Sequence, residues 1–512
     1  MEILLVIFAI QGFLGAFDTL YHHELTERLP WRASAAKELK LHGIRNFFYS
    51  IIFLSLAWCA WNGFFAWVFA FILIAEVVIT LMDFVEEDRS RQLPASERIT
   101  HTILALNYGA ILALLVPILW QWSQVPTGFT PMNFGLLSWL MTFYAACVLV
   151  WGCRDLLRGL WWSRKARSQN AELGKVESAA LALEAAEPTA KDKPSRHSKL
   201  LNISALKKPN QQILVTGGTG FIGKPLCQAL IDQGHSVTIL TRRMKNAAGL
   251  FHGRVTFLDS LDLIQSHDTV DVVINLAGEP ISQRWSVKAK VDMLESRINV
   301  TLALVALIER LVKKPAVFIS GSAIGVYGTD PERSFTEDTL GSHDDLGAYP
   351  RKLCEEWEAV AMRAEQYAVR TCVLRTGVVL GMDGGALAQM LFPFDIGLGG
   401  PMGSGNQWFS WIHRDDIIRL VIHLINNDIH GAVNATAPEP VTNKVFSKAL
   451  GKAMKRPAII PLPAFQVKLL FGQMGATLLL AGQKVMPEKA LASGFVFKFP
   501  TLEPALQHIF TK

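Results

Sequence analysis

Residues 212–223 read QILVTGGTGFIG, and this stretch decides the fold of the C-terminal part of the chain. An apolar strand, residues 212–215, leads into glycines at 217, 220 and 223, and a helical pattern and a second strand follow at 224–233 and 236–240. Glycines in this context let a tight turn bring the backbone to a pyrophosphate at a helix N-terminus. We predict a Rossmann-like, doubly wound parallel sheet that binds a nicotinamide dinucleotide through Gly217, Gly220, Phe221, Ile222 and Gly223.

The end of the second strand indicates which dinucleotide binds. Its residues are Thr241-Arg242-Arg243, with no acid to bind the ribose 2′-hydroxyl of NAD, whereas arginine accommodates the 2′-phosphate of NADP. Arg242 and Arg243 therefore favour NADP, with NAD possible, unless both are only solvated surface charges. A later strand, 272–276, ends in Leu276, Ala277 and Gly278, where we expect the backbone to lie against the adenine side of the cofactor.

The first 160 residues are much more apolar than the rest of this 512-residue chain. A transmembrane helix needs about 20 apolar residues, and five spans are predicted: Glu2–Leu20, Ile44–Trp61, Phe64–Phe84, Thr102–Trp120 and Phe134–Trp151. The first span begins beside Glu2 and has no basic segment before it, so we expect it to be retained. The predicted organisation is an all-α transmembrane bundle (1–160), a flexible linker (161–210), the dinucleotide-binding domain (211–440) and a small domain closing the substrate cleft (441–512).

Lysine and arginine set the predicted orientation. The segments after spans one, three and five are basic, whereas residues 61–63 and 121–133 carry no Lys or Arg. We therefore expect a multi-pass protein of a bacterial-type inner membrane, with its N-terminus outside and its C-terminal domain cytoplasmic. We attribute the net charge of +6 to the basic segments that set the membrane topology, and not to nucleic-acid binding. The six cysteines show no CxxC spacing and read as free thiols in a reducing compartment.

Ionisable residues gather at the cytoplasmic ends of the first four spans, in pairs spaced i, i+4 that share a helix face. Three interpretations are open: a satisfied polar network, a metal or haem site built inside the bundle, or a quinone or lipid-headgroup pocket. The candidate residues are Asp18, His22, Glu38, His42, Glu76, Asp83, Glu87, Glu97 and His101.

Further motifs along the C-terminal part support a family resemblance. They are NLAGEPI (275–281) with Arg284-Trp285, Ser296-Arg297, residues 321–328, KLC (352–354) with Trp357-Glu358, residues 375–380 with Gly384-Gly385, residues 397–405, and WIH (411–413) with Asp415-Asp416. Together with the glycine motif they resemble the extended short-chain dehydrogenase/reductase superfamily, and within it the atypical epimerase family proteins of the YfcH type. The resemblance covers residue 211 to the C-terminus. It implies a doubly wound sheet with a small C-terminal region over the substrate cleft.

The resemblance also implies a catalytic set, from which this chain departs. Classical members use a Ser or Thr, a Tyr that acts as acid and base, and a Lys four residues later that holds the nicotinamide ribose. Lys352 is present, but Ala348 stands four residues before it and Ala323 stands at the usual hydroxyl position. The remaining candidates for catalysis are Lys352, Ser322 and Tyr349, with Lys352 also a candidate for cofactor binding; Tyr327 and His413 are weaker alternatives.

Two functions follow as hypotheses. The first is a membrane-tethered NADP-dependent oxidoreductase or epimerase-like enzyme acting on a small molecule, with a lipid-like molecule as one candidate. The second is a non-catalytic NADP-binding sensor or assembly factor at the inner membrane, which the incomplete Ser-Tyr-Lys set favours. The sequence leaves the substrate, the reaction direction and the oligomeric state open.

Overall fold

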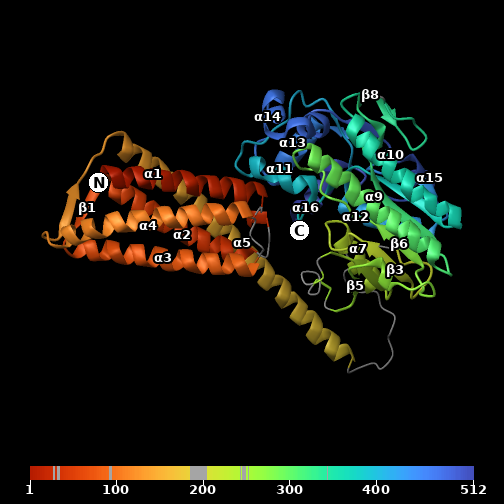
Figure 1. Cartoon of the computed structure of the whole chain (residues 1–512), viewed down its shortest axis with the longest axis horizontal. Coiled ribbons are helices and arrows are strands. Elements are labelled where there is room, and N and C mark those ends of the chain that lie inside the picture. Colours follow the sequence, from red (N-terminus) through yellow and green to blue (C-terminus); the bar gives the residue numbers. More distant parts are fainter. Residues whose placement is uncertain are drawn as a thin grey trace. The chain divides into compact units, whose positions relative to one another are not determined.

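The computed structural model describes residues 1–26, 29–31, 35–90, 95–184, 204–242, 244, 250–251, 253–342 and 344–511. The chain forms two compact units, Met1–Ala190 and Lys191–Lys512 (Figure 1).

The first unit is a helical bundle. Its helices are α1 (Glu2–Phe17), α2 (Ala36–Trp58), α3 (Phe64–Ser90), α4 (Ala95–Ser123) and α5 (Leu136–Glu184), which run side by side (Figure 1). A π-helical segment, η1 (Asp18–Thr26), continues α1, and a short 3-10 turn follows at Leu29–Trp31. Aromatic and aliphatic side chains fill the bundle, among them Phe8, Phe53 and Phe69, all at most 2% exposed.

Four of the described helical segments are long and apolar enough to cross a membrane: Glu2–Glu24, Phe64–Glu87, Ser96–Ser123 and Leu136–Arg164. The sequence predicted five spans, and the second of them, Ile44–Trp61, is not among these four. Residues 44–58 of it lie in α2, whose His42, Arg45 and Asn46 lower the mean hydropathy of the helix, and residues 59–61 belong to a strand. The four segments indicate a multi-pass membrane region, and large apolar side chains such as Phe71 and Leu106 point outward, 70% and 71% exposed.

The prediction of an all-α bundle needs one correction. Strand β1 (Cys59–Asn62), between α2 and α3, pairs antiparallel with β2 (Gly128–Pro131), between α4 and α5. The turn after β1 lies at Gly63, whose φ is +60° and whose Cβ, if present, would lie 2.4 Å from the hydroxyl oxygen of Thr127. The two connections therefore close the same end of the bundle together.

Helix α5 is longer than its predicted span. It continues to Glu184, so residues 161–184 are helical within the segment predicted to be a flexible linker. The stretch Pro188–Ser198, which composition marks as the most solvated part of that linker, lies outside the described residues.

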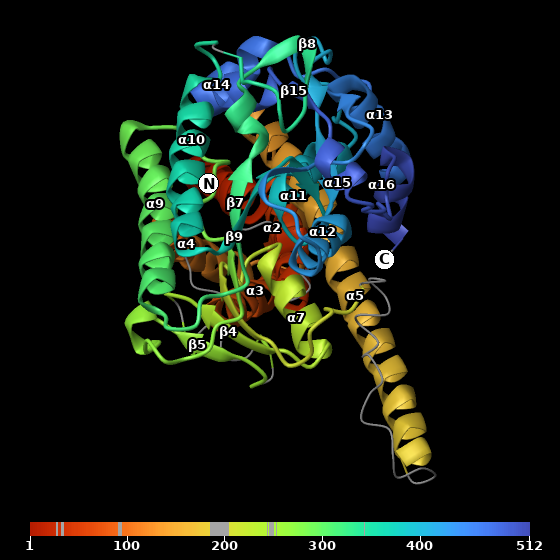
Figure 2. The same cartoon turned by 90° about the vertical axis from the view of Figure 1, so that its right-hand side faces the viewer.

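The second unit contains a parallel sheet of seven strands in the order β13-β9-β7-β6-β3-β4-β5. The strands are β3 (Gln212–Thr216), β4 (Ser236–Leu240), β5 (Thr256–Leu258), β6 (Val272–Asn275), β7 (Val317–Ala323), β9 (Arg370–Thr376) and β13 (Gly431–Ala435). Both faces are covered, because alternate residues of each strand point to opposite sides. Val215 packs in one apolar cluster with helices α7 (Gly223–Asp232) and α12 (Arg414–Asn426). Leu214 packs in another with α9 (Val287–Arg310), beside which α10 (Ala348–Met362) runs (Figure 2). The predicted doubly wound parallel sheet is confirmed.

Smaller elements complete the second unit. Three two-stranded sheets form from β8 (Asp330–Phe335) with β15 (Gln483–Val485), β10 (Val378–Leu380) with β12 (Trp411–His413), and β11 (Trp408–Phe409) with β14 (Val441–Thr442). The remaining helices are α11 (Gly385–Asp395), α13 (Asn443–Met454), α14 (Ala464–Met474), α15 (Glu488–Ala492) and α16 (Leu502–Thr511), with short segments at Leu261–Leu263, Ile324–Tyr327, Arg363–Tyr367 and Gly475–Leu479.

Candidate dinucleotide-binding site

The glycine turn lies between β3 and α7, at the carboxyl edge of the parallel sheet. Gly217 has φ +70°, and a Cβ on it would lie 2.6 Å from the carbonyl carbon and oxygen of Leu276 at the end of β6. A Cβ on Gly223 would lie 2.2 Å from the carbonyl oxygen of Gly217. Any larger residue at either position would force backbone atoms apart, so the turn requires glycine there.

Gly220 has a different role. A Cβ at this position would meet one atom only, the carbonyl oxygen of Gly217 at 3.2 Å. The backbone could therefore carry a side chain at 220 with little strain inside the protein, and its other side is open. An open glycine before a helix N-terminus leaves backbone N–H groups accessible to an anion, as a pyrophosphate would require. The turn fits a dinucleotide.

The side chains of Phe221 and Ile222 are engaged within the protein. The Phe221 ring packs against Gly381, Gly384 and Gly385, and the Arg414 guanidinium lies 5.1 Å from its centroid. Ile222 packs against the apolar cluster under α7. Only the backbone of these two residues is therefore suited to a phosphate.

The end of β6 is held by buried polar contacts. Asn275, which is fully buried, accepts a hydrogen bond of 2.6 Å from Thr216 Oγ1 and donates to Thr301 Oγ1 at 2.9 Å. The following residues Leu276 and Ala277 face Gly217, and a Cβ on Gly278 would lie 2.9 Å from the guanidinium carbon of Arg297. The chain at 276–278 is thereby held directly beside the glycine turn.

The sequence predicts that Arg242 and Arg243 select NADP, and of these two residues the structure describes Arg242. Its side chain is 87% exposed and pairs with Glu279 at 3.0 Å, across the ends of β4 and β6. Arg243 lies outside the described residues.

The three catalytic candidates are placed apart. Ser322 Oγ donates to Glu358 Oε1 at 2.6 Å, and its residue is only 5% exposed. The Tyr349 hydroxyl donates to the carbonyl oxygen of Lys290 on α9. The Lys352 side chain is 75% exposed, with its amino group 3.8 Å from Glu356. The structure does not bring Ser322, Tyr349 and Lys352 together.

The register of α10 explains this separation. A Cβ on Gly325, in the turn after β7, would lie 3.0 Å from Pro350 Cβ and 3.7 Å from Cys354 Sγ. Residues four apart share a helix face, so Pro350 and Cys354 occupy the face toward β7, while Lys352 points to solvent. Burial raises the pKa of the Cys354 thiol to about 12, and it stays protonated.

A polar network that sequence reasoning did not assign lies beside Ser322. Arg375 binds both oxygens of the Glu358 carboxylate at 2.9 Å, and donates to the Tyr327 hydroxyl at 3.0 Å. Tyr327 in turn donates to Asn434 Oδ1 at 2.7 Å, and burial raises its pKa. Glu358 and Arg375 stood among the family-like motifs, but their pairing across α10 and β9 had no local signal.

The fold and the glycine turn define a Rossmann-like NAD(P)-binding protein. A model described as the NAD dependent epimerase/dehydratase family matches residues 213–435, and a domain of unknown function, DUF1731, matches residues 462–509. Both matches lie in the second unit.

Three relatives identify the family within this class to which the chain belongs. The chain is 39% identical over 323 residues to "Epimerase family protein SDR39U1 homolog, chloroplastic" of Arabidopsis thaliana, covering 62% of this chain and 91% of that protein. It is 39% identical over 302 residues to "Epimerase family protein YfhF" of Bacillus subtilis, covering 58% and 97%. A crystal structure of human epimerase family protein SDR39U1 (isoform 2) with NADPH is 37% identical, with a TM-score of 0.54, and covers 59% of this chain and 99% of that one. The chain belongs to this epimerase family, as its motifs indicated.

Proposed function

We propose that the second unit binds NADP(H) in preference to NAD(H). The observation that carries dinucleotide binding is the glycine turn, in which Gly217 and Gly223 leave no room for a Cβ while Gly220 is open. In this proposal the backbone from Gly217 to Gly223 holds the pyrophosphate, and residues 276–278 line the adenine side. Arg242, with Arg243, binds the 2′-phosphate. That the human relative was crystallised with NADPH supports the choice of dinucleotide.

The first unit would anchor this activity in a bacterial-type inner membrane, with the N-terminus outside and the second unit cytoplasmic. The pairing of β1 with β2 supports the topology, because it gathers at one end the two connections that lack Lys and Arg. Helix α2 packs along α3 and α5 and would cross with them. The proposed organisation is a transmembrane domain (1–160), a linker (161–210), a dinucleotide-binding domain (211–440) and a small closing domain (441–512).

For the reaction we propose an oxidoreductase or epimerase-like enzyme that acts on a small molecule, with a lipid-like molecule delivered by the membrane as the candidate. The bound nicotinamide would supply hydride chemistry, and the chain must provide a proton at the reacting oxygen. Ser322 and Tyr349 are the proposed hydroxyl donors, and Lys352 the proposed ribose contact. Each would have to leave its present partner to act.

A second candidate function is a non-catalytic NADP(H) sensor or assembly factor. The observation that favours it is the register of α10, which presents Pro350 and Cys354 to the turn after β7, where neither supplies a proton as a tyrosine–lysine pair would.

Titration of the detergent-purified full-length protein with NADPH and with NADH, followed by nicotinamide fluorescence, tests the binding proposal. We expect NADPH to bind at least about tenfold more tightly, a difference of about 1.4 kcal/mol, and Gly220→Asp to abolish binding by placing a carboxylate at the phosphates. Equal affinities would contradict the NADP preference. Oxidation of NADPH by any member of a panel of lipid aldehydes and ketones would support the enzyme proposal over the sensor proposal.

A further inference from the structure

Buried histidines and carboxylates gather at one end of the first unit, opposite the β1–β2 pair. They come from η1, α2, α3 and α4, segments far apart in the sequence. All are at most 9% exposed: Asp18, His22, His23, His42, Asp83, Glu87, Glu97 and His101. Buried charges are costly unless they are paired or bind a metal, so this cluster requires an explanation.

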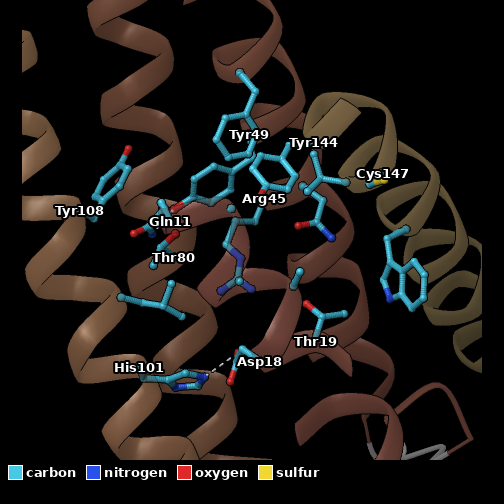
Figure 3. Close-up of a pocket in the computed structure, with 18 of the residues that line it drawn as sticks. Gln11, Asp18, Thr19, Arg45, Tyr49, Thr80, His101, Tyr108, Tyr144 and Cys147 are labelled. Carbon is cyan, nitrogen blue, oxygen red and sulfur yellow. Dashed lines mark hydrogen bonds and ion pairs between the residues drawn. The ribbon is translucent and has the colours of Figure 1, made fainter. Parts of the chain in front are cut away.

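A cavity of about 460 Å³ borders the cluster (Figure 3). Asp18, His101 and Arg45 are among the residues that line it. The side chains of Asp18 and His101 interact with one another at one end of the view in Figure 3. The rest of the wall is mostly apolar and includes Tyr49, Tyr108 and Tyr144. The cluster is thus enclosed by helices on one side and open to a cavity on the other.

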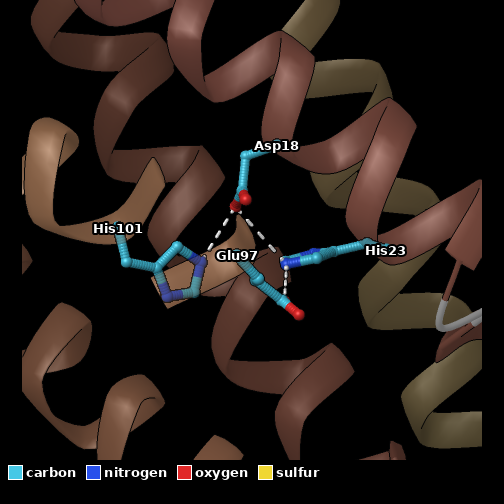
Figure 4. A group of neighbouring side chains, drawn as sticks. All are labelled: Asp18, His23, Glu97 and His101. Carbon is cyan, nitrogen blue, oxygen red and sulfur yellow. Dashed lines mark hydrogen bonds and ion pairs between the residues drawn. The ribbon is translucent and has the colours of Figure 1, made fainter. Parts of the chain in front are cut away.

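Four of these side chains converge on one point (Figure 4). His101 Nε2 lies 3.1 Å from Asp18 Oδ2, and His23 Nε2 lies 3.5 Å from Asp18 Oδ2 and 3.5 Å from Glu97 Oε1. One atom from each residue falls within 4.8 Å of the others. Ligands that share one ion at about 2.1 Å lie roughly 3.0–3.5 Å from one another. The three separations of 3.1–3.5 Å match that range, and side-chain movements of under about 1 Å would bring all four atoms around one ion.

His23 distinguishes this arrangement from an ordinary polar network. Its Nε2 is buried and has no hydrogen-bond partner among the described residues, although it faces two carboxylate oxygens. Buried imidazole nitrogens are normally hydrogen-bonded. A distance of 3.5 Å is long for a hydrogen bond and ordinary for two ligands of one ion. The second nitrogen of the ring, Nδ1, lies 3.1 Å from His42 Nδ1, so His23 is held from both sides.

The groups around these four residues orient them as supporting residues do in known metal sites. His22 Nδ1 bonds the other oxygen of Asp18 at 2.8 Å, and His22 Nε2 lies 3.3 Å from Ser96 Oγ. The other nitrogen of His101, Nδ1, lies 3.4 Å from Glu87 Oε2. Both nitrogens of His101 therefore face carboxylates, which fixes the plane of its ring.

We propose that Asp18, His23, Glu97 and His101 bind one divalent first-row transition metal ion. Two imidazole nitrogens and two carboxylate oxygens suit Zn²⁺, Fe²⁺ or Mn²⁺, whereas Ca²⁺ and Mg²⁺ prefer oxygen ligands alone. Because Asp18 and His101 also line the cavity, an ion that takes more than four ligands, as Fe²⁺ and Mn²⁺ do, would keep a position on that side for a small ligand.

The test begins with the unmodified full-length protein, stripped of metal in detergent and desalted after incubation with Zn²⁺, Mn²⁺, Co²⁺ or, without oxygen, Fe²⁺. We expect about one tightly bound ion per chain by elemental analysis, as for a preformed site, and visible absorption bands from bound Co²⁺. Retention of none of the four ions would overturn the proposal and leave a polar network. This outcome does not depend on any variant folding, or on the second unit binding a dinucleotide.

Variants locate the site. We expect His23→Ala and Glu97→Gln each to lower the retained metal at least about tenfold and to remove the Co²⁺ bands, because each deletes one ligand. The matched control is Glu76→Gln, which removes a fully buried carboxylate that lies on α3 and is not one of the four proposed ligands. Its metal content should equal that of the unmodified protein. If Glu76→Gln loses the ion as fully as Glu97→Gln while both keep their helical content, the assignment of the ligands is wrong.

Discussion

Ser322 and Glu358 form a hydrogen bond of 2.6 Å between the end of β7 and the middle of α10, and the same carboxylate accepts two hydrogen bonds from Arg375. The pair joins the predicted catalytic hydroxyl to a largely buried ion pair, whose side chains are 13% and 12% exposed. Removing one partner of such an ion pair leaves a buried charge uncompensated.

We therefore expect Glu358→Ala to lower the stability of the second unit by about 3–5 kcal/mol, and Ser322→Ala by only about 1 kcal/mol, since Glu358 keeps Arg375. Thermal unfolding of the full-length protein, followed by the transition assigned to the second unit, measures both. Equal losses in the two variants would show that the hydroxyl, and not the ion pair, dominates.

Two glycine variants distinguish a glycine that the turn needs in order to fold from a glycine that it needs in order to bind the dinucleotide. Gly223→Ala places a Cβ 2.2 Å from the Gly217 carbonyl oxygen and should lower both stability and NADPH affinity. Gly220→Ala meets a single atom at 3.2 Å and should leave the unfolding temperature nearly unchanged, while lowering NADPH affinity at least about tenfold, because it fills the approach to the phosphates. Unchanged affinity in a folded Gly220→Ala variant would place the pyrophosphate elsewhere.

Lys352→Ala tests whether the family's ribose contact is kept in this chain. Because its side chain is exposed beside Glu356, we expect a stability change below about 0.5 kcal/mol, whereas loss of the proposed ribose contact should lower the NADPH affinity at least about tenfold. Glu356→Ala is the matched control. An affinity within about twofold of that of the unmodified protein would contradict the proposed ribose contact.

Three buried thiols limit the stability of the second unit at alkaline pH. Burial raises the pKa of Cys227 and Cys354 to about 12 and that of Cys372 to about 11, against about 8.5 for an exposed thiol. The folded state holds these protons more tightly, so the stability they contribute is complete below about pH 8.5 and is lost as the pH rises through 11 to 12. Peptide mapping after iodoacetamide treatment at about pH 8 should find them unmodified until the protein is denatured. Modification of Cys354 in the folded protein would contradict its burial.

The sequence predicts local features of this molecule well. The glycine turn and the parallel sheet follow from residues 212–240, where spacing and hydrophobic pattern act over a few residues. The register of α10 does not, because whether Lys352 or Cys354 faces β7 depends on how the helix packs on distant strands. His23 was missed for another reason. The i, i+4 spacing of an α-helix pairs Asp18 with His22, but η1 is a π-helix with i, i+5 periodicity, which also brings His23 beside Asp18.

The four proposed metal ligands all lie within the first 101 residues, and Gly217 comes 116 residues after His101. At a synthesis rate of about 5–20 residues per second, the first glycine of the dinucleotide turn is made roughly 6–23 s after the last metal ligand. All four proposed ligands are thus present in the chain before the second unit has been translated, so the ion of this proposal could bind during insertion. A cell starved of metal would then produce chains with a complete nucleotide site and an empty bundle, so the two sites fail independently.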